Sequence, residues 1–232
     1  ALESHSLEGT VPIELLQEAN AVPGIDLARI AINKTQNIIG LRLEKAQADL
    51  ALTAANYGAA NKITLSGTGQ WSDLTNSDPI SDVETGKEAV RQLIGLRPNV
   101  MIIGPTVFKS LKQHGKILDR IKYTGRDVPT VELLSALFGL TVVVGDAIWA
   151  TDAGVITDVW GKFAVMAYVE VASLASMGNP SYGYTYQLGG YPIVESPYLD
   201  RNTKSWVYPV TDEVVPVIAG STAGYLISAA VA

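Results

Sequence analysis

The chain has 232 residues and a mass of 24.7 kDa, a size that suits one or two compact domains. Asp, Glu, Lys and Arg make up only 17% of the residues, against about 25% in a typical soluble protein, and 23 acidic against 17 basic side chains give a net charge of −6. This balance argues against broad electrostatic binding to nucleic acid, and the absence of cysteine excludes disulfides, thiolate zinc sites and cysteine nucleophiles.

The first quarter of the chain predicts one short and one long helix. Residues 1–24 form an extended lead-in that contains a helical piece at residues 13–20. A long helical pattern follows at residues 26–56, where Asp26 can accept hydrogen bonds from the free N–H groups of the first turn. At about 1.5 Å per residue such a helix is roughly 45 Å long. Its apolar stripe is formed by Ile39, Leu43, Ala46 and Leu50 and widened by Ile38, Leu41, Ala48 and Leu52.

Helices and apolar strands alternate in the middle of the chain. Asp78-Pro79 is a strong helix start, because Asp can cap the helix and Pro is preorganised for the first helical position. The pattern predicts strands at residues 61–66, 100–103 and 140–144, and helices at residues 78–94, 105–111 and 130–137. This alternation indicates an α/β layer between residues 78 and 160.

The last third of the chain is typical of antiparallel β-structure. Aromatic and apolar side chains alternate with a period of two from Tyr182 to Leu188. The pattern predicts strands at residues 163–171, 182–188, 205–210 and 214–218.

Neither histidine belongs to a metal-like or triad-like pattern, so we expect His5 and His114 to be structural or solvated. Gly67-Thr68-Gly69 lacks the remaining residues of a phosphate loop, and the serine in Gly220-Ser221-Thr222-Ala223-Gly224 is misplaced for a nucleophile elbow. The residues therefore assign no catalytic, cofactor-binding or metal site, and we expect a protein that is not an enzyme.

Asp146, Asp152 and Asp158 are evenly spaced, and their carboxylates could bind a hard cation or act in acid–base chemistry. Nothing fixes their mutual geometry, so turn and capping roles are favoured. A metal-dependent α/β enzyme built on these residues is the unfavoured alternative.

For two further groups of side chains, a subunit contact is one of two possible roles. A small charged cluster is a solvated face or, alternatively, an ion-pair contact between subunits; its members are Asp119, Arg120, Lys122 and Arg126. Seven of the 17 aromatic residues lie between Tyr182 and Tyr208. That stretch has only Arg201 and Lys204 as cations, too few for a groove that tracks phosphates, so packing on a sheet or an interface is favoured.

The order of these elements resembles that of the tailed-bacteriophage major capsid proteins with the Hong Kong 97-like fold. A segment of the "VP.ELL" type precedes the long helix, and a helix, an apolar strand, a short helix and a strand of the "LFG.PVV" type follow. The matching segments are VPIELLQEA at residues 11–19, NVMIIGPTVFKSL at residues 99–111, LFGLTVVV at residues 137–144 and DVWG at residues 158–161. Leu140-Thr141-Val142 departs from the pattern, since the family often has a proline there.

The resemblance implies an α+β, Hong Kong 97-like capsid fold with a spine helix, a P-domain and an A-domain. The N-arm and most of the E-loop normally precede the "VP.ELL" segment, so we expect them to be missing from this chain, and no cross-linking residue is carried over. The expected regions are the end of the E-loop at 1–24, P-domain with the spine helix at 25–77, A-domain at 78–165, P-domain strands at 166–210 and a C-terminal return to the A-domain at 211–232.

The implied function is that of a structural major capsid protein. Copies would assemble into the hexamers and pentamers of an icosahedral head around double-stranded DNA, without recognising its sequence. The resemblance implies a virion protein assembled in the host cytoplasm, with portal, scaffold, maturation protease and decoration proteins as further partners. An encapsulin-like compartment shell is the alternative. No stretch approaches 18 consecutive apolar residues, so we expect a soluble chain without a targeting signal or membrane partner.

Overall fold

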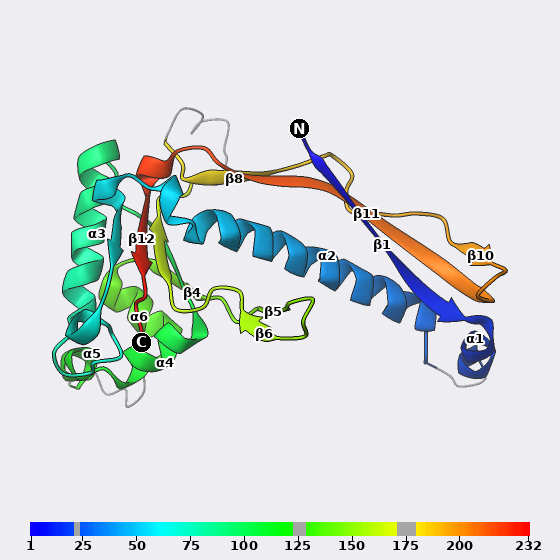
Figure 1. Cartoon of the computed structure of the whole chain (residues 1–232), viewed down its shortest axis with the longest axis horizontal. Helices are drawn as coiled ribbons and strands as arrows, with labels where there is room; N and C mark the ends of the chain where they lie inside the picture. The colour runs from blue at the N-terminus through cyan, green and yellow to red at the C-terminus, as the bar shows by residue number, and fades with distance from the viewer. Residues whose placement is uncertain (21–23, 123–128, 171–179) are drawn as a thin grey trace. The chain divides into compact units, whose positions relative to one another are not determined.

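The computed structural model of the chain combines helices and sheets in an α+β fold (Figure 1). It describes residues 1–20, 24–122, 129–170 and 180–232. The chain forms two compact units, each described by itself below. Unit 1 holds Ala1–Ala46 and Thr185–Val217, and unit 2 holds Gln47–Tyr184 and Ile218–Ala232.

The helices largely match those expected. They are α1 (Ile13–Asn20), α2 (Leu27–Leu52), α3 (Pro79–Ile94), α4 (Pro105–Gln113), α5 (Gly115–Ile121) and α6 (Val131–Phe138). Short 3-10 turns lie at Ala54–Asn56, Ala59–Asn61, Gly67–Gly69 and Ser221–Ala223. The predicted helices at 13–20, 78–94, 105–111 and 130–137 are confirmed to within about two residues at each end. Helix α5 was not predicted from the sequence.

Strand β11 organises the sheet of unit 1. The strands of this sheet are β1 (Glu3–Pro12), β8 (Gly183–Gln187), β9 (Ile193–Val194), β10 (Tyr198–Asp200) and β11 (Ser205–Ile218), and each of the others pairs with β11. Strand β1 runs antiparallel to β11 along its whole length, from Glu3 opposite Val214 to Pro12 opposite Ser205. Residues 3–12 of the expected extended lead-in therefore form a strand in the sheet of unit 1.

The prediction of two separate strands at 205–210 and 214–218 is wrong, because β11 is continuous. The polar residues Thr211 and Asp212 in the middle of β11 find partners within the sheet. Asp212 is buried and accepts a hydrogen bond from Nε2 of Gln187 at 2.8 Å. Thr211 lies opposite Ser6 of β1, and its hydroxyl bonds to the Ser6 hydroxyl at 3.2 Å. Satisfied polar groups can occupy the middle of a buried strand.

Helix α2 confirms the long helix, but it ends at Leu52 rather than at residue 56. It begins after Asp26, whose carboxylate accepts from the N–H of Arg29 at 3.0 Å. At its other end, the hydroxyl of Thr53 donates to the carbonyl of Asp49, and Nδ2 of Asn56 donates to the carbonyl of Leu50. These side chains satisfy carbonyls that the helix leaves free, so the backbone can leave the helical path.

The packed side of α2 is narrower than the sequence indicated. Ile39 is only 7% exposed, whereas its neighbour Ile38 is 46% exposed, so the expected widening of the stripe by Ile38 is wrong. Within unit 1 the helix lies against β1 at Gly9. A Cβ there would come within 2.9 Å of the Thr35 hydroxyl oxygen and 3.1 Å of the Ala31 carbonyl oxygen, which explains the glycine.

Unit 2 is built on a mixed five-stranded sheet in the order β2-β12-β7-β3-β4. Its strands are β2 (Lys62–Thr64), β3 (Val100–Ile103), β4 (Thr141–Val144), β7 (Ala164–Ala167) and β12 (Gly224–Ser228). Strands β3 and β4 are parallel, as the predicted α/β alternation requires, and β7 is antiparallel to both β3 and β12.

The C-terminal strand β12 was not predicted. Val171, the last residue of the predicted strand at 163–171, lies outside the described residues.

The helices of unit 2 begin and end where local signals place them. Asp78 accepts a hydrogen bond from the N–H of Ser81 at 3.1 Å, and Gly95 ends α3 with a left-handed φ of 75°. Thr130 caps α6 through the N–H of Leu133, and Gly139 ends it in the same left-handed conformation.

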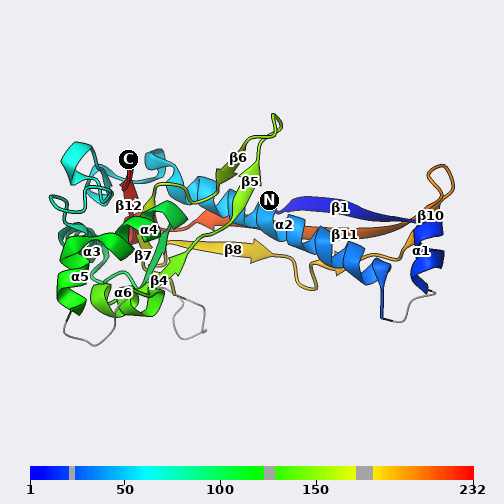
Figure 2. The ribbon, with the colours of Figure 1, turned by 90° about the horizontal axis from the view of Figure 1, so that it is seen from below.

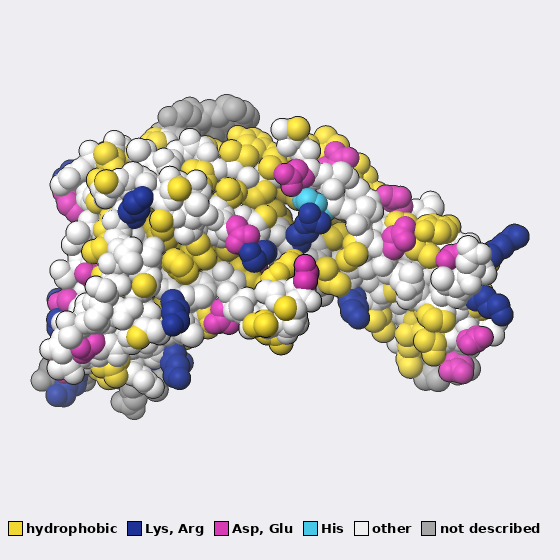
Figure 3. Space-filling model, in the orientation of Figure 1, with side chains coloured by type: hydrophobic (Ala, Val, Ile, Leu, Met, Phe, Trp, Pro, Cys, Tyr) yellow, Lys and Arg dark blue, Asp and Glu magenta, His cyan; other side chains and the backbone are white. Residues whose placement is uncertain are grey.

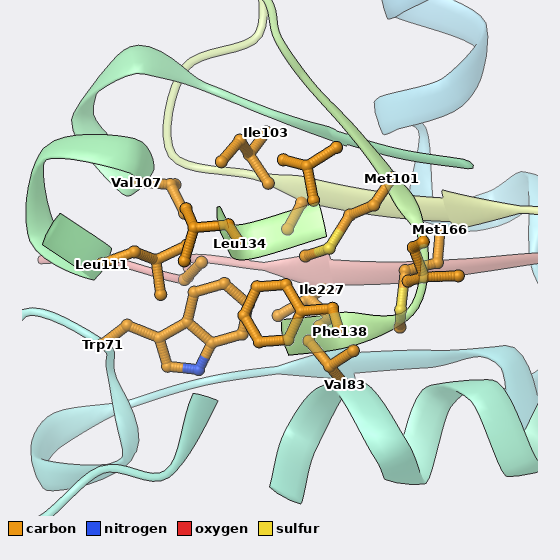
Figure 4. Close-up of a cluster of buried hydrophobic side chains, with 14 of the residues drawn as sticks. Trp71, Val83, Met101, Ile103, Val107, Leu111, Leu134, Phe138, Met166 and Ile227 are labelled. Atoms are coloured by element: carbon orange, nitrogen blue, oxygen red, sulfur yellow. The ribbon is translucent and has the colours of Figure 1, made fainter. Parts of the chain in front are cut away.

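The core of unit 2 lies between α3 and the sheet, and helices α4 and α6 complete it (Figure 4). Its largest side chain, Trp71, is fully buried, and its indole Nε1 donates to Oδ2 of Asp82 at 2.8 Å. Around Trp71 lie Val83, Met101, Ile103, Val107, Leu111, Leu134, Phe138, Met166 and Ile227. Residues distant in the sequence therefore meet in one core, which depends on the complete sheet.

His114 is fully buried where α4 ends and α5 begins. Its Nε2 lies 2.9 Å from Oγ of Ser77, whose hydroxyl donates to the carbonyl of Asp73 at 2.7 Å. Nε2 must therefore carry the hydrogen, and Nδ1 has no hydrogen-bond partner among the described residues. This confirms a structural role for His114 and excludes a solvated one.

Leu134→Ala tests the core. We expect it to lower the free energy of unfolding by about 2–5 kcal/mol, because it leaves a cavity among fully buried side chains. Leu93→Ala is the matched control, because Leu93 is 48% exposed near the end of α3, and we expect a change within about 0.5 kcal/mol. Urea unfolding of both variants measures the difference, and equal losses would contradict this placement of the core.

The stability of unit 2 should fall in mild acid. Burial lowers the pKa of His114 below its ordinary value of 6.5, and the charge of Lys116 acts in the same direction, against the opposing effects of Asp78 and Asp73. The unfolded chain therefore binds a proton at a higher pH than the folded chain. The free energy of unfolding should drop below about pH 6.5 by up to about 1.4 kcal/mol per pH unit.

His114→Gln removes this titration and keeps a donor for Ser77. Urea unfolding between pH 7.5 and 5.5 should show a steeper loss of stability in the wild type than in the variant. Equal slopes would contradict the lowered pKa.

Candidate assembly surfaces

The residues weighed for chemistry lie on separate elements of the part of the chain that the structure describes. His5 lies half-buried on β1, with Nε2 at 3.7 Å from Oε2 of Glu3. Gly67–Gly69 forms a 3-10 turn that leads into further loop rather than into a helix. No group of three His, Cys, Asp or Glu side chains among the described residues could hold a metal ion.

Asp146, Asp152 and Asp158 lie on a hairpin of two short strands, which the sequence did not predict. Its strands are β5 (Ile148–Ala150) and β6 (Ile156–Asp158). Asp146 precedes β5, Asp152 lies in the turn and Asp158 ends β6, and all three are exposed. The acidic hairpin, as we call residues 146–158, carries these three carboxylates and no Lys or Arg.

The acidic hairpin also exposes apolar side chains. Ile148 lies opposite Asp158, and Ala150 lies opposite Ile156, which places these four residues on one face. Ile148 is 53% exposed and Ile156 is 66% exposed. The tip of the hairpin stands away from α4, α5 and α6 (Figure 2), and hydrophobic side chains are visible among other atoms in this region of Figure 3.

The base of the acidic hairpin is held firmly by unit 2. Trp160 is buried over Gly145, where a Cβ would come within 2.0 Å of the indole ring. The N–H of Val159 donates to the carbonyl of Ala147 at 2.9 Å, which extends the pairing of β5 and β6 towards this base. An anchored base with an exposed apolar tip is typical of an arm that contacts another molecule.

Helices α4 and α5 carry a basic surface in the same unit. The basic α4–α5 surface consists of Lys109, Lys112, Lys116, Arg120 and Lys122. Lys112 lies over the ring of Phe108 at 4.7 Å, and Nζ of Lys116 lies 3.0 Å from Oδ2 of Asp78. Within the described ranges, Lys109, Arg120 and Lys122 make no ion pair.

These cations include most of the charged cluster noted in the sequence. Arg120, Lys122 and the neighbouring Asp119 are exposed, and Arg126 lies outside the described residues. A few Lys and Arg side chains are visible at the lower left of Figure 3, with Asp and Glu side chains among them, where Figure 1 draws α4 and α5.

Several aromatic residues of the last third lie on strands and stay exposed, namely Tyr184, Tyr186, Tyr198 and Trp206. In unit 1, Tyr198 lies opposite Val207 of β11, and its hydroxyl donates a hydrogen bond to Oε1 of Glu8 at 3.0 Å. The side chain of Tyr198 thereby covers the buried Val207. In unit 2, the rings of Tyr57 and Tyr182 stack with centroids 5.9 Å apart. Burial raises the pKa of the Tyr57 hydroxyl, so this group stays neutral at physiological pH.

A second apolar surface lies on the outer face of α2 in unit 1. Ile30 and Ile38 are exposed there around a shallow depression, and the other residues that line it are Asn33, Lys34, Asn37 and Leu41. No helix in the described part of the chain combines the length and apolar character needed to cross a membrane.

The chain is similar to phage capsid proteins over nearly its whole length. The family described as Phage major capsid protein E matches residues 45–179. The major capsid protein of Burkholderia phage BcepMu is 37% identical over 231 residues, which cover 98% of this chain and 73% of that protein. A solved structure of a phage-related protein from Bordetella bronchiseptica RB50 is 41% identical, with a TM-score of 0.88, and the match covers 99% of this chain and 76% of that one.

Two less similar structures show the fold alone. The capsid protein of Myoviridae phage XM1 is 15% identical, with a TM-score of 0.56 and coverage of 97% of this chain and 72% of that one. The SrpI encapsulin of Synechococcus elongatus PCC 7942 is 12% identical, with a TM-score of 0.52 and coverage of 98% and 74%. Together these findings confirm the resemblance stated above: the chain belongs to the phage major capsid protein family, whose members are structural shell proteins, and has the Hong Kong 97-like α+β fold.

Proposed function

We propose that copies of this chain assemble into the hexamers and pentamers of an icosahedral phage head that encloses double-stranded DNA. The observation that carries this proposal is the 37% identity to a phage major capsid protein over 98% of the chain. Self-assembly is the role of a shell protein, and the partner of each copy is then mainly another copy.

The physical character of the chain supports this role. With 17% charged residues, the surface loses little solvation energy when subunits cover it. Exposed apolar side chains gather on the acidic hairpin and on the outer face of α2. The net charge of −6 disfavours tight adhesion of packed DNA to the wall, so the head can hold DNA without binding a sequence.

The finer expectations from the family resemblance are part of the same proposal. We propose portal, scaffold, maturation protease and decoration proteins as further partners, assembly in the host cytoplasm and the absence of an enzymatic activity. The division into P-domain and A-domain at residues 25–77, 78–165, 166–210 and 211–232 stays a prediction.

An encapsulin-like compartment that holds protein cargo is the alternative. Its support is a likeness of fold at 12% identity, whereas the relative at 37% identity is a phage major capsid protein and the one at 41% identity is a phage-related protein. The phage head is therefore favoured.

The assembly state of the purified gene product tests the proposal. We expect light scattering and negative-stain electron microscopy to show capsomers or closed shells, because subunits with large complementary surfaces associate at micromolar concentration. A strict monomer at tens of micromolar would contradict the proposed function.

A further inference from the structure

We propose that the acidic hairpin of one copy docks on the basic α4–α5 surface of a second copy. The inference rests on the proposed function, because it names one contact by which the shell protein recognises itself. The contact is directional: it joins two different surfaces, so each copy uses its hairpin on one neighbour and its helices on another.

The acidic hairpin first needs a partner for stability. Its two strands pair only with each other in the described sheets, and a two-stranded hairpin is marginal in water unless it packs on something else. Ile148 and Ile156 are more than half exposed on one face, and residues 150–158 are exposed without exception. Covering this face would remove apolar surface from water and stabilise the arm.

Charge indicates which surface provides the cover. Residues 146–158 have a net charge of −3, from three Asp and no Lys or Arg. Residues 105–122 have five Lys or Arg against one Asp, a net charge of +4 with His114 neutral. Five of the 17 basic residues of a chain with a net charge of −6 lie in this segment. Lys116 is paired with Asp78, and the other four are the positive side chains that complement the acidic hairpin.

The basic α4–α5 surface also offers apolar area for the isoleucines. Phe108 is half-buried beneath Lys112, and the alkyl stems of Lys109 and Lys112 are apolar. Ile156 can pack on such stems while Asp152 and Asp158 meet the ammonium and guanidinium groups. A partner in the nucleic acid class is disfavoured for the hairpin, because its phosphates would face three carboxylates.

The second copy, rather than the same copy, supplies the helices. The base of the hairpin is fixed by Trp160 over Gly145, and its tip stands away from α4 and α5 of its own unit (Figure 2). A contact between two different surfaces of identical copies forms a ring when its rotation closes.

Charge reversal tests the contact. Asp152→Lys combined with Asp158→Lys places like charges against the basic α4–α5 surface. We expect the protein concentration needed for assembly to rise roughly tenfold or more, and the melting temperature of the unassembled subunit to stay unchanged, because both side chains are exposed. Adding Lys109→Glu and Arg120→Glu should restore assembly.

The matched control is Glu14→Lys combined with Glu18→Lys. These two acids are exposed on α1, and reversing them changes the net charge by the same amount without touching either proposed surface. We expect this variant to assemble as the wild type does.

The outcomes separate the inference from the proposed function. Shells from the wild type and from the Asp152→Lys, Asp158→Lys variant at equal concentration would overturn the contact and leave the shell function standing. Loss of assembly without rescue by the helix substitutions would overturn α4–α5 as the partner surface. A wild type that never assembles would instead refute the proposed function.

Discussion

The burial of β7 is the constraint on which unit 2 depends. All four residues of this strand are buried, and it lies between β3 on one side and β12 on the other. Helix α3 packs so closely on it that a Cβ at Gly86 would come within 2.2 Å of Cε of Met166. Just before β7, Trp160 is buried over Gly145, and a Cβ at Gly104 would meet the carbonyl of Gly161 at 1.8 Å. The same packing that closes the core therefore anchors the acidic hairpin, whose tip is left exposed.

The residues that stabilise the fold of unit 2 are therefore different from the residues that we propose to bind a neighbouring copy. The interior of unit 2 is filled by its own side chains, including the indole of Trp71 bonded to Asp82. The surface, in contrast, exposes apolar and acidic side chains on the acidic hairpin and an excess of Lys and Arg side chains on the basic α4–α5 surface. A capsid protein needs this combination, because each subunit must fold before it meets its neighbours and must still bind them through specific surfaces.

Local signals in the sequence predict the elements that depend on local interactions. Asp78-Pro79 and Gly95 delimit α3, and the apolar runs at Val100 and Thr141 predict the parallel pair β3 and β4. The elements that were missed depend on distant partners: β1 and the polar middle of β11 satisfy each other, and β12 is a strand because β7 and β2 lie beside it. The same limit holds for the surfaces. The even spacing of Asp146, Asp152 and Asp158 is compatible with a metal site. Their common position on one exposed hairpin follows from the pairing of β5 with β6, which the sequence does not predict.

The central claim is that exposed surfaces of this chain bind other copies of it. A cryo-EM reconstruction of the particles formed by the gene product tests this claim most directly. The account predicts that residues 146–158 of each copy lie on α4 and α5 of a neighbour, with Asp152 or Asp158 within about 4 Å of a Lys or Arg on those helices. A hairpin that faces solvent in the assembled shell, or that lies on an acidic surface of its neighbour, would contradict the account.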